Sequence, residues 1–244
     1  MPVYKCNECS HEYIQQSQPS NCEVCNANDF KIIEEKKNSR FRDVKKSIPS
    51  IIEETIIDER LIKPSPVWLP ISKFAKFEDG SLFQQVSKPN WGEWSVWNTN
   101  SSSHNIQKAD YSLDVKKVNG PNNCLYGILT TIQEPTVLNC YYLLITSNGH
   151  FSIGKHSTKK WKHHVDRKKH SSIRQGDNIN TLRVVTEGDL ITGFINGEKV
   201  ESFRDKFYPY KSSNIGVYST SNEEGNGVAV YFNNIKVITT IFKD

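Results

Sequence analysis

Short runs of apolar, aromatic and β-branched residues fill the chain from about residue 67 to its end, and Gly, Asn, Asp and Pro separate them. Each run has the length of a β-strand, and the separating residues are those that form tight turns. The pattern predicts about ten strands with no helix between them, and therefore two packed sheets. The predicted strands are 94–97, 111–117, 125–132, 140–146, 150–154, 180–186, 190–196, 198–202, 215–219 and 228–237.

Two of these runs differ in the faces that they should bury. The run from Tyr141 to Ile145 is apolar at every position, which predicts a central strand covered on both faces. The run from Asp110 to Val115 alternates between polar and apolar residues, which predicts a strand with one exposed face.

The segment from residue 34 to residue 66 has the composition of an exposed connection, because it begins with a charged run and ends at Pro64-Ser65-Pro66. Ser50 and Glu53 form a capping box inside it, which predicts one short helix. We expect the helix to pack on the body of the protein, and partner binding is the alternative. Its apolar residues recur at near-helical spacing: Ile52, Ile56, Ile57 and Leu61.

Four cysteines near the start of the chain form two Cys-x-x-Cys pairs, Cys6 with Cys9 and Cys22 with Cys25. Two such pairs on facing hairpins enclose a tetrahedral four-thiolate site of the kind that Zn2+ prefers. A redox pair needs a βαβ context and a disulfide framework needs export, and the surrounding sequence indicates neither. The spacing therefore predicts a zinc ribbon over residues 1–33, with one structural Zn2+ and no open coordination position.

The same opening resembles the small regulatory zinc ribbons of bacterial proteins, which begin with Met-Pro-x-Tyr. The resemblance rests on Met1-Pro-Val-Tyr4, on Ser10-His11-Glu12-Tyr13 and on the two cysteine pairs. Ser10 and Asn26 stand where such ribbons usually carry glycine, so the first knuckle is expected to be slightly distorted. The family implies contacts with nucleic acids or with proteins.

The two remaining cysteines, Cys124 and Cys140, fall within adjacent predicted strands. A hairpin that turns near Pro135 places them several residues out of register, too far apart for a disulfide. We expect both to be buried, unbridged thiols.

The order of strands and turns in the body resembles the concanavalin A-like jelly roll over roughly residues 74 to 240. Within that superfamily the resemblance is to the laminarinase-like and keto-disaccharide-hydrolase-like bacterial domains. The matching positions are strand and turn residues, so the resemblance implies a fold and says little of an activity. The segments that carry it are 126–129, 141–145, 180–185, 188–191, 194–197, 215–218 and 230–235.

Taken together, the sequence predicts an all-β protein with a zinc ribbon at residues 1–33, a partly helical linker at 34–66, and a two-sheet concanavalin A-like jelly-roll sandwich at 67–244. The net charge of +4 is too small to specify a partner. No run approaches the ~18 apolar residues of a membrane span, and no signal peptide precedes Cys6. We therefore expect a cytoplasmic protein without a membrane partner.

Laminarinases of the resembled superfamily cleave glycans with carboxylates in a Glu-x-Asp-x-x-Glu run on one strand, and this chain has no such run. Asp110 and Asp114 share one face of a predicted strand, but they fit the solvated side of an alternating pattern. We therefore expect a protein without catalytic residues. A glycoside-processing enzyme would require carboxylates that converge from separate strands.

Residues 155–174 combine eight lysines and arginines with four histidines and Trp161, against the single acid Asp166. This density predicts a basic loop that attracts phosphate or another polyanion, with Trp161 able to stack on a base or a sugar. The alternative is a solvated face in a connection between strands. The candidate anion-binding residues are Lys155, Lys159, Lys160, Lys162, Arg167, Lys168, Lys169 and Arg174.

Three further tryptophans, Trp91, Trp94 and Trp97, lie close together in the sequence. In a strand Trp91 and Trp97 share one face and Trp94 takes the other, so at least one should belong to the core. An exposed indole would suit a sugar ring, and the alternative is that all three pack inside. With Trp161 they are the candidate ligand-binding residues.

These features predict a non-catalytic binding protein whose sandwich recognises a glycan or a protein surface, with the zinc ribbon as a second contact module. The alternative is a nucleic-acid-associated protein in which the ribbon and residues 155–174 bind phosphates. Salt separates the two, because phosphate binding weakens steeply with salt and the stacking of a neutral sugar does not.

Overall fold

The computed structural model describes residues 2–8, 12–14, 30–35, 50–59, 73–97, 106–133, 138–157, 160–206 and 212–243. The chain divides into two compact units, Met1–Ile48 and Pro49–Asp244. Within the described residues every regular element is a β-strand, which confirms the all-β prediction. No helix in that part of the chain is long and apolar enough to cross a membrane.

The first unit contains the strands β1 (Pro2–Cys6), β2 (Glu12–Ile14) and β3 (Phe30–Glu35). They form one antiparallel sheet with β1 in the middle. Cys6 ends β1, lies opposite Phe30, and has a buried side chain. The other three predicted zinc ligands, Cys9, Cys22 and Cys25, lie outside the described residues, so the zinc ribbon stays a prediction.

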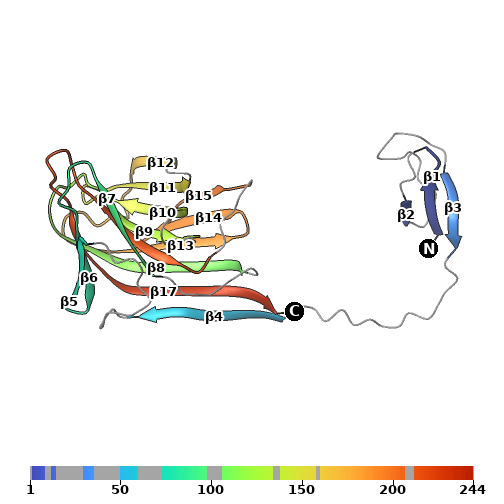
Figure 1. The fold of residues 1–244 in the computed structure, drawn as a ribbon, viewed down its shortest axis with the longest axis horizontal. Helices are drawn as coiled ribbons and strands as arrows, with labels where there is room; N and C mark the ends of the chain where they lie inside the picture. The colour runs from blue at the N-terminus through green and yellow to red at the C-terminus, as the bar shows by residue number, and fades with distance from the viewer. Residues whose placement is uncertain are drawn as a thin grey trace. The chain divides into compact units, whose positions relative to one another are not determined.

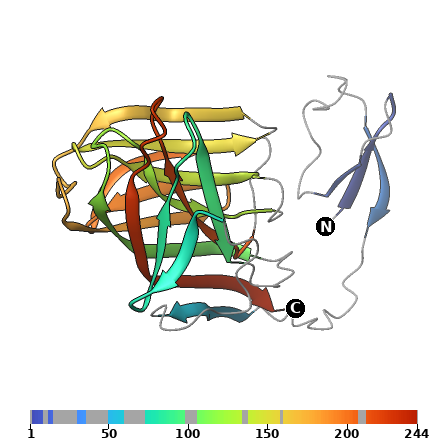
Figure 2. The same cartoon turned by 60° about the vertical axis from the view of Figure 1, so that its left-hand side comes forward.

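The second unit consists of two antiparallel sheets that pack as layers, as Figures 1 and 2 show. The strands of one sheet are β7 (Gly92–Trp97), β9 (Tyr126–Thr130), β10 (Cys140–Ile145), β11 (His150–Ser157), β12 (Lys160–Lys169) and β16 (Ile215–Thr220). The strands of the other are β4 (Ser50–Glu59), β5 (Ala75–Glu78), β6 (Ser81–Gln85), β8 (Ile106–Asn119), β13 (Ile179–Glu187), β14 (Leu190–Ile195), β15 (Glu198–Arg204) and β17 (Ala229–Lys243).

The first sheet has the strand order β12-β11-β10-β9-β16-β7, and we call it the six-stranded sheet. The second has the order β15-β14-β13-β8-β17-β6-β5, with β4 also paired to β17, and we call it the eight-stranded sheet. This arrangement confirms the prediction of a two-sheet sandwich.

The main core lies between the two sheets, because alternate residues of each strand point inward. Tyr141, Leu143 and Ile145 of β10 belong to it, together with Leu182 and Val184 of β13. Every residue of β10 is buried, which confirms its prediction as a central strand. The burial of β8 alternates, as the pattern around Asp110 predicts.

The hairpin of β9 and β10 pairs Tyr126 with Ile145 and Thr130 with Tyr141. This register keeps Cys124 and Cys140 at different levels of the hairpin. Both are buried and unbridged, as predicted. Burial raises the pKa of each thiol, so neither is a reactive thiolate at neutral pH.

The predicted helix in the linker is wrong, because residues 50–59 form β4 and pair with β17 from Glu59 opposite Ile235 to Ser50 opposite Lys243. Half of the ten residues of β4 are β-branched, which favours extended backbone over helix. The register shifts near Thr55, and Glu53, Thr55 and Asp58 are exposed. The edge of β17 supplies the hydrogen bonds that a local helix would have made internally.

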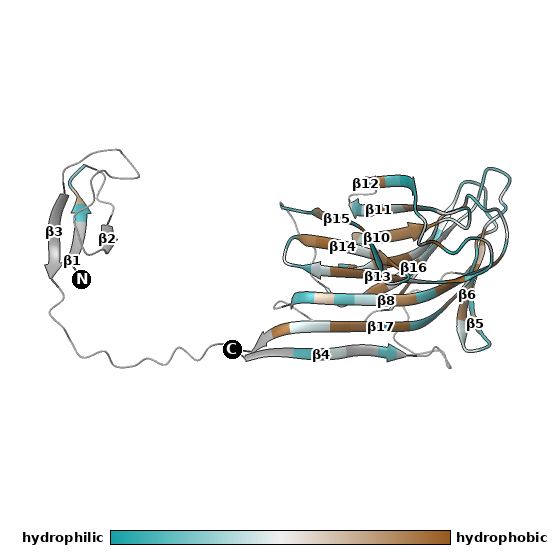
Figure 3. Ribbon diagram, turned by 180° about the vertical axis from the view of Figure 1, so that it is seen from behind, coloured by the Kyte–Doolittle hydropathy of each residue, from teal (hydrophilic) through white to brown (hydrophobic). Residues whose placement is uncertain are grey.

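The basic segment is also not a loop, because residues 160–169 form β12 at the edge of the six-stranded sheet. His156 of β11 lies opposite Trp161, and His150 lies opposite Lys169. Figure 3 shows β12 as mostly hydrophilic and β10 as mostly hydrophobic. An edge strand is exposed along its length, and lysines there prevent pairing with other chains.

Candidate functional site

The outer face of the six-stranded sheet carries a second buried cluster, which we call the aromatic face. Its rings are Trp94 of β7, Tyr142 of β10, Trp161 of β12 and Tyr218 of β16. Tyr142 points to this side because its neighbours on β10, Tyr141 and Leu143, point to the main core, and its side chain is fully buried here. The sheet therefore has one face in the sandwich core and a second apolar face of its own.

Trp161 covers much of this aromatic face. Its ring centroid lies 4.9 Å from that of Tyr142 and 5.0 Å from that of Tyr218. Three strands separate β12 from β16, a distance of roughly 19 Å along a flat sheet at ~4.8 Å per strand. Contact between Trp161 and Tyr218 therefore requires the sheet to curve toward this face.

A tyrosine and a histidine meet beneath Trp161. The hydroxyl of Tyr142 lies 2.7 Å from Nδ1 of His163 on β12. The rings of the two residues stand nearly perpendicular, and Asp166 lies 3.8 Å from the same nitrogen. Burial raises the pKa of Tyr142, so its hydroxyl stays protonated at neutral pH. The pair is a proton donor and acceptor in direct contact.

Two glycines make room for the hydroxyl groups of this face. A Cβ atom on Gly154 would lie 2.6 Å from the hydroxyl oxygen of Tyr142, and one on Gly92 would overlap the hydroxyl of Tyr218. The indole nitrogen of Trp94 is buried without a hydrogen-bond acceptor among the described residues. Such a donor costs about 1–3 kcal/mol when it stays unpaired, and a bound ligand can satisfy it.

A polar pocket of about 470 Å³ lies at one end of the sandwich, beside the aromatic face. Thr220 lines it and lies two residues beyond Tyr218 on the same face of β16, so the pocket adjoins the aromatic face. Arg167 of β12 reaches it from the other side and donates a hydrogen bond to the carbonyl of Asn123 at 2.9 Å. The remaining polar lining includes Asn90, Asn222, Glu223 and Glu224.

Trp91 stands beside this pocket. Its backbone N–H donates to the hydroxyl of Ser221, a residue that lines the pocket, at 3.1 Å. Its indole is 39% exposed, and the indole N–H donates to Glu93 at 2.8 Å. Nζ of Lys88 lies 3.3 Å from the ring centroid. The indole is therefore exposed but held in one orientation.

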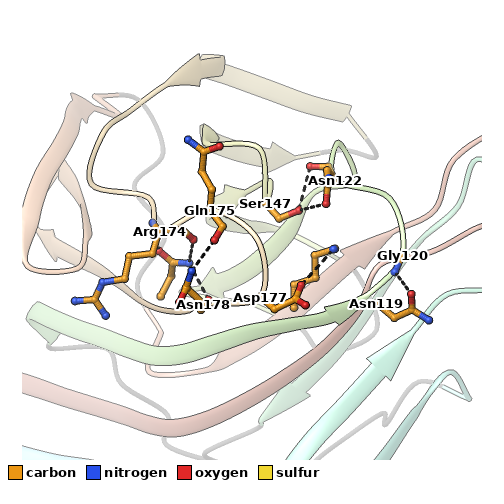
Figure 4. Close-up of polar contacts among 10 residues, drawn as sticks. Asn119, Gly120, Asn122, Ser147, Arg174, Gln175, Asp177 and Asn178 are labelled. Carbon is orange, nitrogen blue, oxygen red and sulfur yellow. Dashed lines mark hydrogen bonds and ion pairs between the residues drawn. The ribbon is translucent and has the colours of Figure 1, made fainter.

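Figure 4 shows side-chain hydrogen bonds in the loops that contain Asn122 and Ser147. The hydroxyl of Ser147 donates to Oδ1 of Asn122 at 3.0 Å, and Asn122 precedes the pocket residue Asn123. A pocket built on fixed loops loses little conformational entropy when it binds a ligand.

The predicted anion-binding residues have different surroundings. Lys155 is largely buried and forms an ion pair with Asp205, and Nζ of Lys168 lies 3.7 Å from Glu201. Arg167 belongs to the polar pocket. Arg174 donates to the carbonyl of Ile179. Lys160, Lys162 and Lys169 are exposed on β12, and Lys159 lies outside the described residues.

The predicted tryptophan set is divided in the same way. Trp97 belongs to the main core and is 3% exposed, so it cannot stack on a ligand. Trp94 and Trp161 belong to the aromatic face, and only Trp91 of the four is exposed. Sequence reasoning missed Tyr142 and Tyr218, because an apolar run predicts burial without showing where a hydroxyl group points.

The described residues hold no group of three or more His, Cys, Asp or Glu suited to a metal ion. Cys6 is the one described member of the predicted zinc set, and its burial is consistent with a structural role.

The fold has known counterparts. A Bacillus subtilis protein of unknown function with a galectin-like fold is 10% identical, with a TM-score of 0.53, and the match covers 80% of this chain and 100% of that one. A tyrosine variant of a family 7 alginate lyase bound to product is 11% identical, with a TM-score of 0.51, covering 69% and 84%. A histidine and tyrosine variant of that lyase bound to substrate has the same identity and TM-score, and the match covers 71% of this chain and 84% of that one. No protein-family model and no curated protein sequence matches the chain.

These likenesses show that the body is a galectin-like and concanavalin A-like β-sandwich. They also correct the expectation of a protein without catalysis, because the same fold carries alginate lyases. The missing Glu-x-Asp-x-x-Glu run excludes one arrangement of catalytic carboxylates. It does not exclude other acid–base pairs, such as Tyr142 and His163.

Proposed function

We propose that the sandwich binds a glycan in the polar pocket, with Trp91 stacking on a sugar ring at its edge. The observation that carries this proposal is the exposed, oriented indole of Trp91 beside a pocket of amides, one guanidinium and two carboxylates. A sugar presents an apolar ring face together with hydroxyl groups that both donate and accept hydrogen bonds. Asn90, Asn123 and Arg167 can donate, and Glu223 and Glu224 can accept.

Two further observations support a glycan as the ligand. Solved structures of the same fold include lyases named for alginate, a polysaccharide, bound to product and to substrate. The nucleic-acid alternative is weakened because Lys155 and Lys168 are paired with carboxylates. In this proposal the predicted zinc ribbon at residues 1–33 adds a second contact, to the same or another partner.

Affinity electrophoresis of the full chain against alginate, laminarin, xylan and galactan tests the proposal. We expect retention by at least one polysaccharide, and about tenfold weaker binding for Trp91→Ala and for Arg167→Gln, or ~1.4 kcal/mol each. Lys199→Ala, at an exposed position on β15, is the matched control and should bind like the native protein. Retention by none of the four, or native binding by both variants, would refute the proposal.

A second candidate function is cleavage of the bound glycan, and the contact between Tyr142 and His163 favours it. Elimination next to a uronate carboxyl group needs one group to remove a proton and one to protonate the leaving oxygen. A phenol in contact with an imidazole can supply such a proton transfer. Trp161 covers Tyr142, so cleavage requires this indole to move.

The ultraviolet absorbance of the unsaturated product of elimination measures this activity directly on alginate. We expect activity to fall at least a hundredfold in Tyr142→Phe, which keeps the ring, and to be unchanged in the control Tyr126→Phe, whose ring lies in the main core. Turnover that survives Tyr142→Phe would exclude Tyr142 from the reaction.

A further inference from the structure

Strand β17 changes its neighbour in the middle of the eight-stranded sheet. The register with β6 ends at Phe232 opposite Leu82, and the register with β4 begins at Ile235 opposite Glu59. Asn233 and Asn234 lie between these two registers, and Asn234 has a positive φ of 50°. The sheet is thus interrupted along this edge of β17.

A pocket of about 290 Å³ lies at this interruption, on the face of the sheet that points away from the core. Asp114 and Lys116 of β8 and Tyr231 of β17 form its floor, since alternate residues of these strands share this face. Asp79, in the turn between β5 and β6, and Ile179, at the start of β13, also line it. Pockets for small molecules are typically about 300–1,000 Å³, so this one suits a single ring.

The carboxylate of Asp114 is fixed in place before any ligand binds. One oxygen accepts a hydrogen bond from the hydroxyl of Thr181 at 2.6 Å, and the other accepts one from Nδ2 of Asn234 at 2.6 Å. Each carboxylate oxygen can accept a further bond. Asp114 is therefore an oriented acceptor at the pocket.

The apolar part of the pocket is oriented as well. The hydroxyl of Tyr231 donates to Glu78 at 3.0 Å, and its ring packs on that of Phe83 with centroids 5.2 Å apart. Ile179 is 50% exposed, which is unusual for an isoleucine in a folded domain. Tyr231 and Ile179 thus offer apolar surface beside the acidic groups of Asp79 and Asp114.

We infer that this pocket is a second binding site, and that it takes a single uncharged sugar ring. The ring face would lie on Tyr231 and Ile179, and its hydroxyl groups would donate to Asp114 and Asp79. The two carboxylates disfavour a polyanion, and the described residues hold no three-ligand metal group. The site belongs to the other sheet from the polar pocket and stands on its own contacts.

Two sites on different sheets make the sandwich bivalent toward glycans. Two weak sites on one body raise the overall avidity for a branched or surface-bound glycan without any new contact.

Amide chemical shifts of the full chain, measured by NMR during titration with methyl glycosides of glucose, galactose and mannose, test this inference. We expect one of them to shift the amides of Asp114, Ile179 and Tyr231. Asp79→Asn keeps a residue that tolerates the positive φ at this turn, and it should weaken the response about tenfold. Glu198→Gln, on the exposed end of β15, is the matched control.

Absence of shifts at these amides with all three glycosides would overturn the inference, and so would an unchanged response in Asp79→Asn. The Trp91→Ala variant should keep the response, because Trp91 belongs to the other site. If no polysaccharide is retained but the glycosides still shift these amides, the proposed function is refuted and the second site stands. If a polysaccharide is retained but no glycoside shifts these amides, the second site is refuted and the proposed function stands.

Discussion

The hydroxyl of Tyr142 reaches Nδ1 of His163 across an intervening strand, at 2.7 Å. Gly154 of β11 lies opposite both residues, in register with Tyr142 on one side and His163 on the other. The tyrosine hydroxyl occupies the space that a side chain at residue 154 would fill. Glycine in the middle strand therefore allows groups on two non-adjacent strands to meet.

Gly154→Ala should break this contact. The new Cβ would lie 2.6 Å from the Tyr142 hydroxyl and even closer to a backbone carbonyl, so the protein should lose about 1–3 kcal/mol in urea unfolding. Gly193→Ala is the control, since its nearest atom is a methyl group of Ile153 that can turn away. Equal losses in the two variants would show that room for Tyr142 is not the reason for glycine at 154.

Stability should fall in alkaline solution, because burial raises the pKa of several groups in the folded state. The groups are the thiols of Cys124 and Cys140 and the hydroxyls of Tyr111, Tyr126, Tyr142 and Tyr218. The folded state then holds more protons than the unfolded state above the unfolded pKa values, about 8.5 for cysteine and 10 for tyrosine. The free energy of unfolding therefore decreases as the pH rises through this range and is unaffected by these groups below about pH 8.

Urea unfolding at several pH values between neutrality and strong alkali measures this slope. Tyr142→Phe should make the slope shallower above about pH 10, by up to ~1.4 kcal/mol per pH unit. A variant with the native slope would show that Tyr142 ionises as readily in the folded protein as in the unfolded chain.

Asp205→Ala should be among the most destabilising changes of a charged residue. The carboxylate pairs with Lys155, and both side chains are about 15% exposed. It also accepts a hydrogen bond from Tyr141. Its removal takes the carboxylate away from a largely buried ammonium, at a cost of about 3 kcal/mol.

The pair of Arg204 and Asp189 gives the comparison for this prediction, since its side chains are 55% and 33% exposed. Asp189→Ala should cost less than about 1 kcal/mol in the same unfolding assay. The double variant Lys155→Met with Asp205→Ala should recover part of the loss. A further loss instead would argue against the buried charge of Lys155 as the cause.

Thr55→Pro should destabilise the sandwich, because residue 55 lies in β4 and pairs with Ile238 of β17. Proline removes a backbone donor and disrupts the strand pairing on both sides, at a cost of at least about 1 kcal/mol. Thr55→Ala keeps the backbone donor, and its side chain is exposed, so it should change little. Hydrogen exchange should show protected amides in residues 51–58, and rapid exchange there would argue against the strand.

The four N-terminal cysteines should bind one Zn2+ per chain. Elemental analysis of the purified protein should find the metal, and Cys9→Ser should abolish it, whereas Cys140→Ser should not. Residues 1–48 form a compact unit of their own, so a chelator should leave the unfolding of residues 49–244 unchanged. Protein free of zinc with those thiols paired would contradict the prediction.

Local patterns in the sequence determined most of the sandwich. The strands at 111–117, 140–146 and 180–186 were predictable because side-chain alternation and turn residues act over a few positions. The turn at Asn196-Gly197, where both residues have positive φ, has the same local origin. The unbridged state of Cys124 and Cys140 followed from hairpin register, and their burial followed from the apolar character of the thiol.

Only the tertiary structure decided the fate of two segments with ambiguous patterns. Residues 50–59 fit a helix or a strand, and the available edge of β17 made them a strand. Residues 160–169 read as a charged loop, and pairing with β11 made them an edge strand. In both cases the hydrogen bonds come from residues distant in the sequence, which no local pattern contains.

The site residues follow the same division. The sequence alone identified Trp91, Trp161 and Arg167 as candidate contacts. Their separation into a polar pocket and a covered aromatic face depends on the order and curvature of the strands. The sequence sets the type of each side chain. Its exposure and its neighbours depend on which strands lie beside its own, and long-range strand pairing decides this only when the chain folds.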